Sequence, residues 1–94
     1  MASGKKSGVQ KKVVFEYFAP QAEKVALAGT FNDWKPTKTP LKKDREGKWK
    51  VEIFLGPGRY EYRYWIDGNW QNDQKTVECV PNPFGTWNCV LEIR

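Results

Sequence analysis

The chain has 94 residues, a formal net charge of +5, two cysteines and no histidine. A chain of this length forms one domain with a modest core and has little room for a deeply buried active site. Without histidine, acid–base and metal chemistry would rest on carboxylates and two thiols, which are too few for a four-ligand zinc site. We therefore expect a domain that is not an enzyme, with no catalytic residues, no metal site and no cofactor.

Residues 1–12 are rich in glycine, serine and lysine, and they are predicted to form a disordered basic tail ahead of a folded domain at 13–94. The simplest explanation of the positive charge is therefore a solvated tail and a charged loop, without a nucleic-acid role. The N-terminal stretch lacks the apolar segment of a signal peptide, and no run approaches the roughly 20 apolar residues of a membrane span. We expect a cytoplasmic protein, or a module of a longer chain, with no membrane partner.

From residue 13 onward the sequence indicates short strands separated by turns, without a convincing helical period. Strand-like segments occupy residues 13–18, 25–29, 49–55, 60–66 and 88–94, with a further short strand at Leu41. Turn residues recur about every 8–12 positions. About seven to eight short strands predict an all-β, immunoglobulin-like antiparallel β-sandwich. A five-stranded barrel of the OB kind is the competing architecture.

Two of these segments alternate between apolar and polar residues, as half-buried strands do. In residues 49–55 the apolar set begins at Trp49, which we expect in the core. In residues 60–66 the tyrosines and Ile66 alternate with charged residues and Trp65. We expect the tyrosines to face the core and the charged positions to face outward.

The pair Asp67-Gly68 is the strongest hairpin signal in the chain, because a type I′ turn needs positive φ at both central positions. A two-residue turn here pairs Trp65 with Trp70 and Arg63 with Asn72. Directly paired residues point to the same face of a sheet. Trp70 is therefore predicted to lie outward, beside a guanidinium and an amide.

A flat aromatic ring with polar neighbours suits a pyranose, whose axial C–H face lies on the ring. Removing about 100 Å² of apolar surface from water gives roughly 2–3 kcal/mol for each stacked ring. Trp34, in the irregular loop at 31–36, is a second candidate platform. The alternative for Trp70 is a structural cross-strand pair with Trp65, which we expect to act mainly as a wall, and the pattern does not place Trp87.

Four motifs follow one another along the chain: GTFNDW at 29–34, PGRYEYRY at 57–64, DGNW at 67–70 and PNPFGTWN at 81–88. In order and spacing they resemble the family 48 carbohydrate-binding modules, and the resemblance covers about residues 13–94. This family includes the glycogen-binding domain of the AMP-activated protein kinase β subunit and the N-terminal modules of branching and debranching enzymes. The resemblance implies an immunoglobulin-like sandwich that binds α-1,4-linked glucan in glycogen, starch or maltooligosaccharides.

The resemblance also implies six carbohydrate-binding residues: Trp34, Arg63, Trp70, Phe84, Thr86 and Asn88. The two tryptophans would stack on sugar rings, and the threonine and asparagine would add hydrogen bonds. Arg63 stands where lysine is usual, which replaces a point donor with a planar fork and rearranges hydroxyl contacts. Phe84 stands where leucine is usual. Its stiffer, broader side chain bears on the length of glucan that is preferred and on whether branched glucan is tolerated.

The expected partner is α-glucan polysaccharide or maltooligosaccharide, together with a glycogen- or starch-active enzyme or a kinase subunit that the module serves. An alternative is a protein-interaction module that uses the same exposed aromatic side chains. A third interpretation is single-stranded nucleic-acid binding, which would depend steeply on salt, whereas binding of a neutral sugar would not. We expect no nucleic-acid partner.

Both cysteines are expected to be reduced, since no signal peptide is present. Cys89 shares its strand parity with Leu91 and Ile93, which predicts an inward-facing thiol. Cys79 lies across the loop from it, so a bridge between the two is geometrically conceivable.

Overall fold

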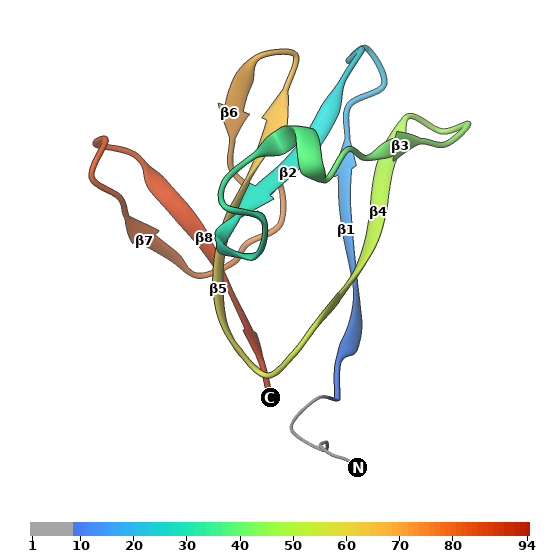
Figure 1. Ribbon diagram of the computed structural model, residues 1–94. Coiled ribbons are helices and arrows are strands. Elements are labelled where there is room, and N and C mark those ends of the chain that lie inside the picture. The colour runs from blue at the N-terminus through green and yellow to red at the C-terminus, as the bar shows by residue number, and fades with distance from the viewer. Residues whose placement is uncertain (1–8) are drawn as a thin grey trace.

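The computed structural model describes residues 9–94 as two antiparallel β-sheets packed face to face (Figure 1). The strands are β1 (Lys11–Phe18), β2 (Val25–Gly29), β3 (Lys42–Lys43), β4 (Lys48–Leu55), β5 (Gly58–Ile66), β6 (Asn69–Gln71), β7 (Cys79–Pro81) and β8 (Trp87–Ile93). Two 3-10 turns, η2 (Thr30–Asn32) and η3 (Pro36–Lys38), follow β2. One sheet has the order β1-β4-β3, and the other has the order β2-β5-β8-β7 with β6 also paired to β5. The predicted antiparallel sandwich is confirmed.

The first strand begins inside the segment that was expected to be a tail. Lys11 and Lys12 pair with Leu55 and Phe54 of β4, so β1 starts before the predicted boundary at residue 13. Residues 1–8 of the expected tail lie outside the described residues. Within the part that is described, no helix is long and apolar enough to span a membrane.

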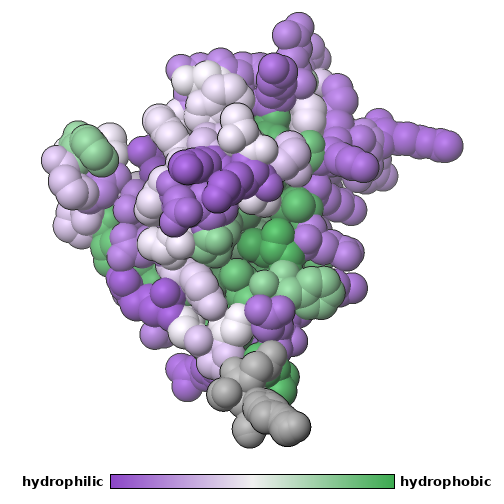
Figure 2. Space-filling view, viewed as in Figure 1, coloured by the Kyte–Doolittle hydropathy of each residue, from purple (hydrophilic) through white to green (hydrophobic). Residues whose placement is uncertain are grey.

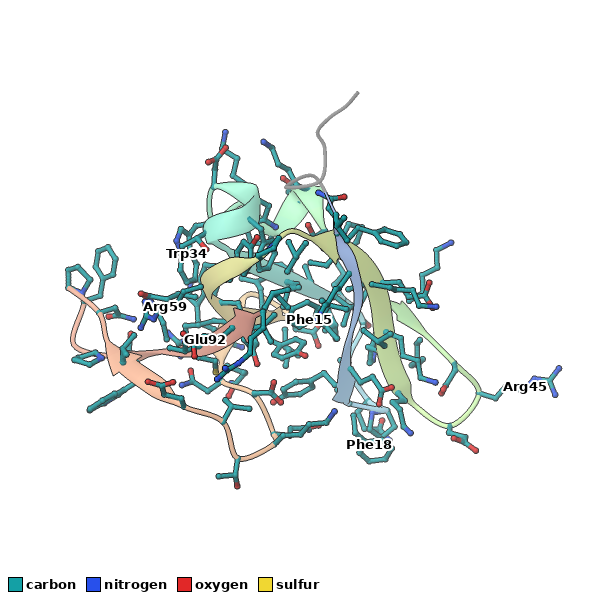
Figure 3. The ribbon with its side chains drawn as sticks, turned by 90° about the horizontal axis from the view of Figure 1, so that it is seen from below. Phe15, Phe18, Trp34, Arg45, Arg59 and Glu92 are labelled. Atoms are coloured by element: carbon teal, nitrogen blue, oxygen red, sulfur yellow. The ribbon has the colours of Figure 1, made fainter. Side chains whose placement is uncertain are left out.

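The core lies between the two sheets, and Figure 3 shows Phe15 in the space between them. Its buried members are Phe15, Val25, Leu27, Leu41, Trp49, Tyr62, Tyr64 and Cys89. Trp49 is 7% exposed, and its Nε1–H donates to the Ala19 carbonyl oxygen at 2.8 Å. The predicted core position of Trp49 is therefore confirmed, and its one polar atom has a partner, as a buried indole requires.

The tyrosines of β5 show how the pleat separates the two faces of the strand. Tyr62 and Tyr64 are buried, as predicted from their alternation. The Tyr62 hydroxyl donates to Asp73 Oδ2 at 2.6 Å, and the Tyr64 hydroxyl donates to the Glu16 carbonyl oxygen at 3.1 Å. Burial is the main cause that raises the pKa of both phenols above the ordinary value, so they stay neutral donors.

The predicted hairpin is present between β5 and β6. Asp67 and Gly68 have φ of 48° and 90°, and Trp65 pairs with Trp70, as a two-residue turn of type I′ requires. The Asp67 carboxylate also accepts hydrogen bonds from the backbone amides of Glu23 and Lys24. The turn is therefore tied to the loop before β2, which fixes where the outward face of β6 points.

We expect Trp49→Ala to lower the free energy of unfolding by about 3–5 kcal/mol, because it opens a cavity between the sheets. Trp87→Ala is the matched control: Trp87 is 53% exposed, so its loss should cost less than about 1 kcal/mol. Urea unfolding followed by circular dichroism gives both values. Equal losses in the two variants would contradict the core position of Trp49.

Candidate functional site

A groove of about 740 Å³ lies on the outer side of the larger sheet. All six residues that the sequence singled out line it: Trp34, Arg63, Trp70, Phe84, Thr86 and Asn88. They come from the loop after η2, from β5 and β6, and from the β7–β8 hairpin. Figure 3 shows Trp34 on the side of the molecule toward which that hairpin projects, away from Phe18 and Arg45. Three segments that are distant in sequence thus meet at one concave surface.

Trp34 is held in the groove by an unusual backbone. Both Asp33 and Trp34 have φ of 59°, a left-handed conformation that is uncommon for non-glycine residues and a genuine outlier for bulky ones. The Trp34 amide donates to the Gly29 carbonyl oxygen at 2.9 Å. The buried Asn32 side chain accepts from the Gly29 amide at 2.9 Å and donates to Leu27 O and Thr39 Oγ1. These hydrogen bonds fix the loop. Strained backbone conformations such as the positive φ of Trp34 are found more often at functional sites than elsewhere.

Trp70 reaches the groove from β6, where it remains 42% exposed. The β5–β6 ladder ends at Gln71, so the predicted strand pairing of Arg63 with Asn72 is not formed. The two residues meet instead through a hydrogen bond of 2.7 Å from Arg63 Nε to Asn72 Oδ1. Trp65 pairs with Trp70 in register but lines a separate depression of about 640 Å³, not the groove. Trp87, which the sequence did not place, pairs with Pro81 at the end of β7 and is not part of the groove lining.

The loop of the β7–β8 hairpin is organised by Asn82. Its Oδ1 accepts from the Phe84 amide at 3.0 Å and from the Thr86 amide at 3.1 Å. Its Nδ2 donates to Thr86 Oγ1 at 2.8 Å and to Asn88 Oδ1 at 2.9 Å. One side chain therefore fixes the loop that presents Phe84, which is 89% exposed. The hairpin projects from the body in Figure 1, and Figure 2 shows apolar surface at its tip.

The polar floor of the groove is a continuous chain of hydrogen bonds. Asn88 Nδ2 donates to Glu61 Oε1 at 3.0 Å, and Arg59 Nη1 donates to Glu61 Oε2 at 2.8 Å. At the other end, Arg63 Nη1 donates to Thr86 Oγ1 at 3.2 Å. The Asn88 amide first and the Arg59 guanidinium second lower the pKa of Glu61, so its carboxylate stays charged and acts as an acceptor.

Three residues of the lining, Glu61, Asn82 and Pro83, were not among those that the sequence singled out. Glu61 could have been found, because it shares strand parity with Arg63 on the outward face of β5. Asn82 carried a weaker signal: an asparagine before proline is typical of a turn. Its contacts to Thr86 and Asn88 depend on the folded hairpin.

Chemically, the groove combines three aromatic rings with a rim of planar donors and acceptors. Trp34, Trp70 and Phe84 offer flat apolar surface. Arg63 offers guanidinium N–H groups that are not used by the two hydrogen bonds described for it within residues 9–94. Such a surface suits a ligand with one apolar face and a polar edge.

Residues 11–94 match a family model described as the glycogen recognition site of AMP-activated protein kinase. The chain is 31% identical over 62 residues to Protein FLOURY ENDOSPERM 6, chloroplastic, of Oryza sativa subsp. japonica, which covers 66% of the chain and 12% of that protein. It is 35% identical over 77 residues to 1,4-alpha-glucan branching enzyme GlgB of Fusobacterium nucleatum subsp. nucleatum, which covers 80% of the chain and 12% of that enzyme.

A further relative is Phosphoglucan phosphatase DSP4, amyloplastic, of Castanea sativa, at 29% identity over 89 residues. That match covers 93% of the chain and 24% of the phosphatase. The chain therefore spans no more than about a quarter of the length of these three relatives.

We expect Asn82→Ala to speed amide hydrogen exchange at Phe84 and Thr86 by tenfold or more, because both amides lose their acceptor. A hydrogen bond that contributes about 1.4 kcal/mol corresponds to a factor of ten. Asn82→Asp keeps an acceptor oxygen at this position and should restore slow exchange, although it loses the hydrogen bonds that Nδ2 donates to Thr86 and Asn88. NMR exchange rates give the comparison, and unchanged rates in Asn82→Ala would mean that the backbone alone holds the loop.

Proposed function

The chain belongs to the family of carbohydrate-binding modules represented by the glycogen recognition site of AMP-activated protein kinase, and we propose that the groove on β5 is its α-1,4-glucan site. The observation that carries the proposal is the meeting of Trp34, Trp70 and Phe84 around one polar floor. Glycogen, starch and maltooligosaccharides all present such chains. The proposed ligand is a short stretch of curved glucan lying across the rings.

Stacking supplies the main attraction in this proposal. Each glucose ring places its apolar C–H face on a tryptophan, and burial of about 100 Å² gives roughly 2–3 kcal/mol. Two rings on one chain double the contact, although part of the gain is offset by the entropy lost on binding. The side chain of Phe84 stands out from the loop and reaches the curve of the glucan between the two tryptophans.

Hydroxyl recognition falls to the polar floor. The Arg63 guanidinium donates to sugar hydroxyls, the Glu61 carboxylate accepts from them, and the Asn88 amide group both donates and accepts. The Thr86 hydroxyl already accepts from Asn82 Nδ2 and Arg63 Nη1 and donates to Asn82 Oδ1, so its part is to hold Arg63 in place. Asn72 and Thr86 hold the guanidinium through Nε and Nη1, so its remaining donors are presented in a fixed plane. This preorganisation suits arginine, whose planar fork differs from the flexible ammonium of lysine.

The proposed role is non-catalytic. Each glucan contact is modest, but a polysaccharide offers many overlapping sites, so a bound module keeps whatever it is attached to near the polymer. The relatives named as branching enzyme and phosphoglucan phosphatase are several times longer than this chain, which fits a module that serves a larger enzyme. In this proposal, the chain to which the module is attached determines which enzyme or kinase subunit it serves, and the groove does not.

Trp34→Ala and Trp70→Ala should each weaken binding of maltoheptaose at least tenfold, because each removes a stacking contact of about 2 kcal/mol. The double variant should show no measurable binding. Calorimetric titration at low and high salt measures the affinity, and a neutral sugar should give nearly the same value at both, unlike a nucleic acid. Trp87→Ala is the control, since it lies outside the groove. Folded variants that bind like the parent would place the sugar elsewhere.

Phe84→Ala should weaken maltoheptaose binding while changing the free energy of unfolding by less than about 0.5 kcal/mol, since the ring is exposed. Phe84→Leu should keep most of the affinity but shift the preferred length in a series of maltooligosaccharides, because leucine is narrower and more flexible. Titrations paired with thermal melts test both variants. A drop of several degrees in the melting temperature of Phe84→Ala would show a structural role.

A further inference from the structure

Cys79 and Cys89 lie directly opposite one another in the β7–β8 pair. The Val90 amide, one residue beyond Cys89, donates to the carbonyl oxygen of Glu78, one residue before Cys79, at 2.8 Å. In an antiparallel ladder this bond flanks a pair whose own backbone groups do not bond each other. At such a non-hydrogen-bonded pair the Cα atoms are about 4.5 Å apart and the side chains approach most closely.

This position suits a disulfide. Bridged cysteines have Cα atoms about 4.4–6.8 Å apart, and side chains on the same face of a sheet point alike. The register that places the two thiols together is held by the pairing of Val80 with Asn88 and of Pro81 with Trp87. A bridge would therefore form without a change of register.

The two thiols differ in exposure, so they differ in whether a reagent in solution can reach them. Cys79 lies on the edge strand and is exposed, whereas Cys89 is 0% exposed. Cys89 Sγ accepts from the Asp73 amide at 3.3 Å, and burial is the main cause that raises its pKa to about 11. The exposed thiol can meet an oxidant from solution, and the buried thiol can meet only its neighbour.

We propose that Cys79 and Cys89 form a reversible disulfide, made by exchange with a small disulfide such as oxidised glutathione, that ties β7 to β8 below the Asn82 loop. The Cys79 thiolate attacks one glutathione sulfur, the glutathione S–S bond breaks, and one glutathione thiolate leaves. The Cys89 thiol gives its proton to the released glutathione thiolate, its sulfur attacks the Cys79 sulfur, and the second glutathione leaves. Two protein thiols are oxidised, and one glutathione disulfide is reduced to two thiols.

The bond would close the hairpin whose tip carries Phe84. The enclosed loop is short and already ordered, so the disulfide constrains the unfolded chain more than it alters the folded one. The oxidised domain should therefore be the more stable form, with the groove unchanged. This site belongs to the scaffold beneath the proposed glucan surface and uses none of its six residues.

The test is incubation of the folded 94-residue chain with oxidised glutathione, followed by intact-mass analysis under non-reducing conditions. The parent should lose two hydrogens and retain no glutathione. Cys89→Ser should retain one glutathione on Cys79, and Cys79→Ser should remain unmodified because its thiol is buried. The oxidised parent should melt roughly 10 °C higher than the reduced form, and dithiothreitol should reverse both changes.

A parent that ends as a glutathione adduct, or an oxidised form that melts no higher than the reduced one, would overturn the proposal. Equal modification of Cys79→Ser and Cys89→Ser in the folded state would overturn the assigned order of attack. The mass and melting readouts need no sugar. Failure of maltoheptaose binding would therefore count against the glucan site alone, and failure of bridge formation would count against this proposal alone.

Discussion

The pleat of β5 is the constraint on which both the core and the groove depend. Successive residues of this strand point to opposite sides, so Tyr62 and Tyr64 enter the core while Glu61 and Arg63 face outward. The buried hydroxyls satisfy Asp73 and the backbone of β1, and the outward groups hold the hydrogen-bonded floor. A slip of register by one residue would expose the phenols and bury the charges, and so would destroy both features together.

Around this strand, the groove is assembled from parts of unequal rigidity. The central floor belongs to a sheet that is paired on both edges of β5, whereas Trp34 and Phe84 stand on loops. Each loop has an asparagine at its centre: Asn32 for the first and Asn82 for the second. An amide side chain both donates and accepts, so a single residue can close a turn that no regular ladder supports. Trp34 and Phe84 are thereby held by side-chain hydrogen bonds rather than by a strand ladder.

Much of this arrangement could be predicted from the sequence where the rules are local. The Asp67-Gly68 turn fixed the register of the hairpin, and with it the shared face of Trp70 and Arg63. The alternation around Trp49 predicted its burial. The left-handed backbone at Trp34 could not be predicted, because nothing in its neighbours demands it and the fold around Asn32 imposes it.

Other features that the sequence did not predict also depend on contacts with distant parts of the chain. The short strand β7 was not predicted, since three residues ending in a proline carry almost no pattern of their own and depend on β8 for pairing. The composition around Lys11 and Lys12 is that of a tail. They nevertheless belong to β1, because β4 is long enough to pair with them. The loop and the hairpin pointed to Trp34, Trp70 and Arg63, whereas Phe84, Thr86 and Asn88 came from the resemblance of whole motifs, and the structure brings all six together.

The Asn82 loop has a thermodynamic consequence. Because its backbone is already fixed by Asn82, a ligand that covers Phe84 would order little that was free before, and the loss of conformational entropy on association would be small. Apolar surface would still leave water as the sugar covers the three rings. Association should then carry a negative change in heat capacity that comes from solvent release rather than from folding of the loop.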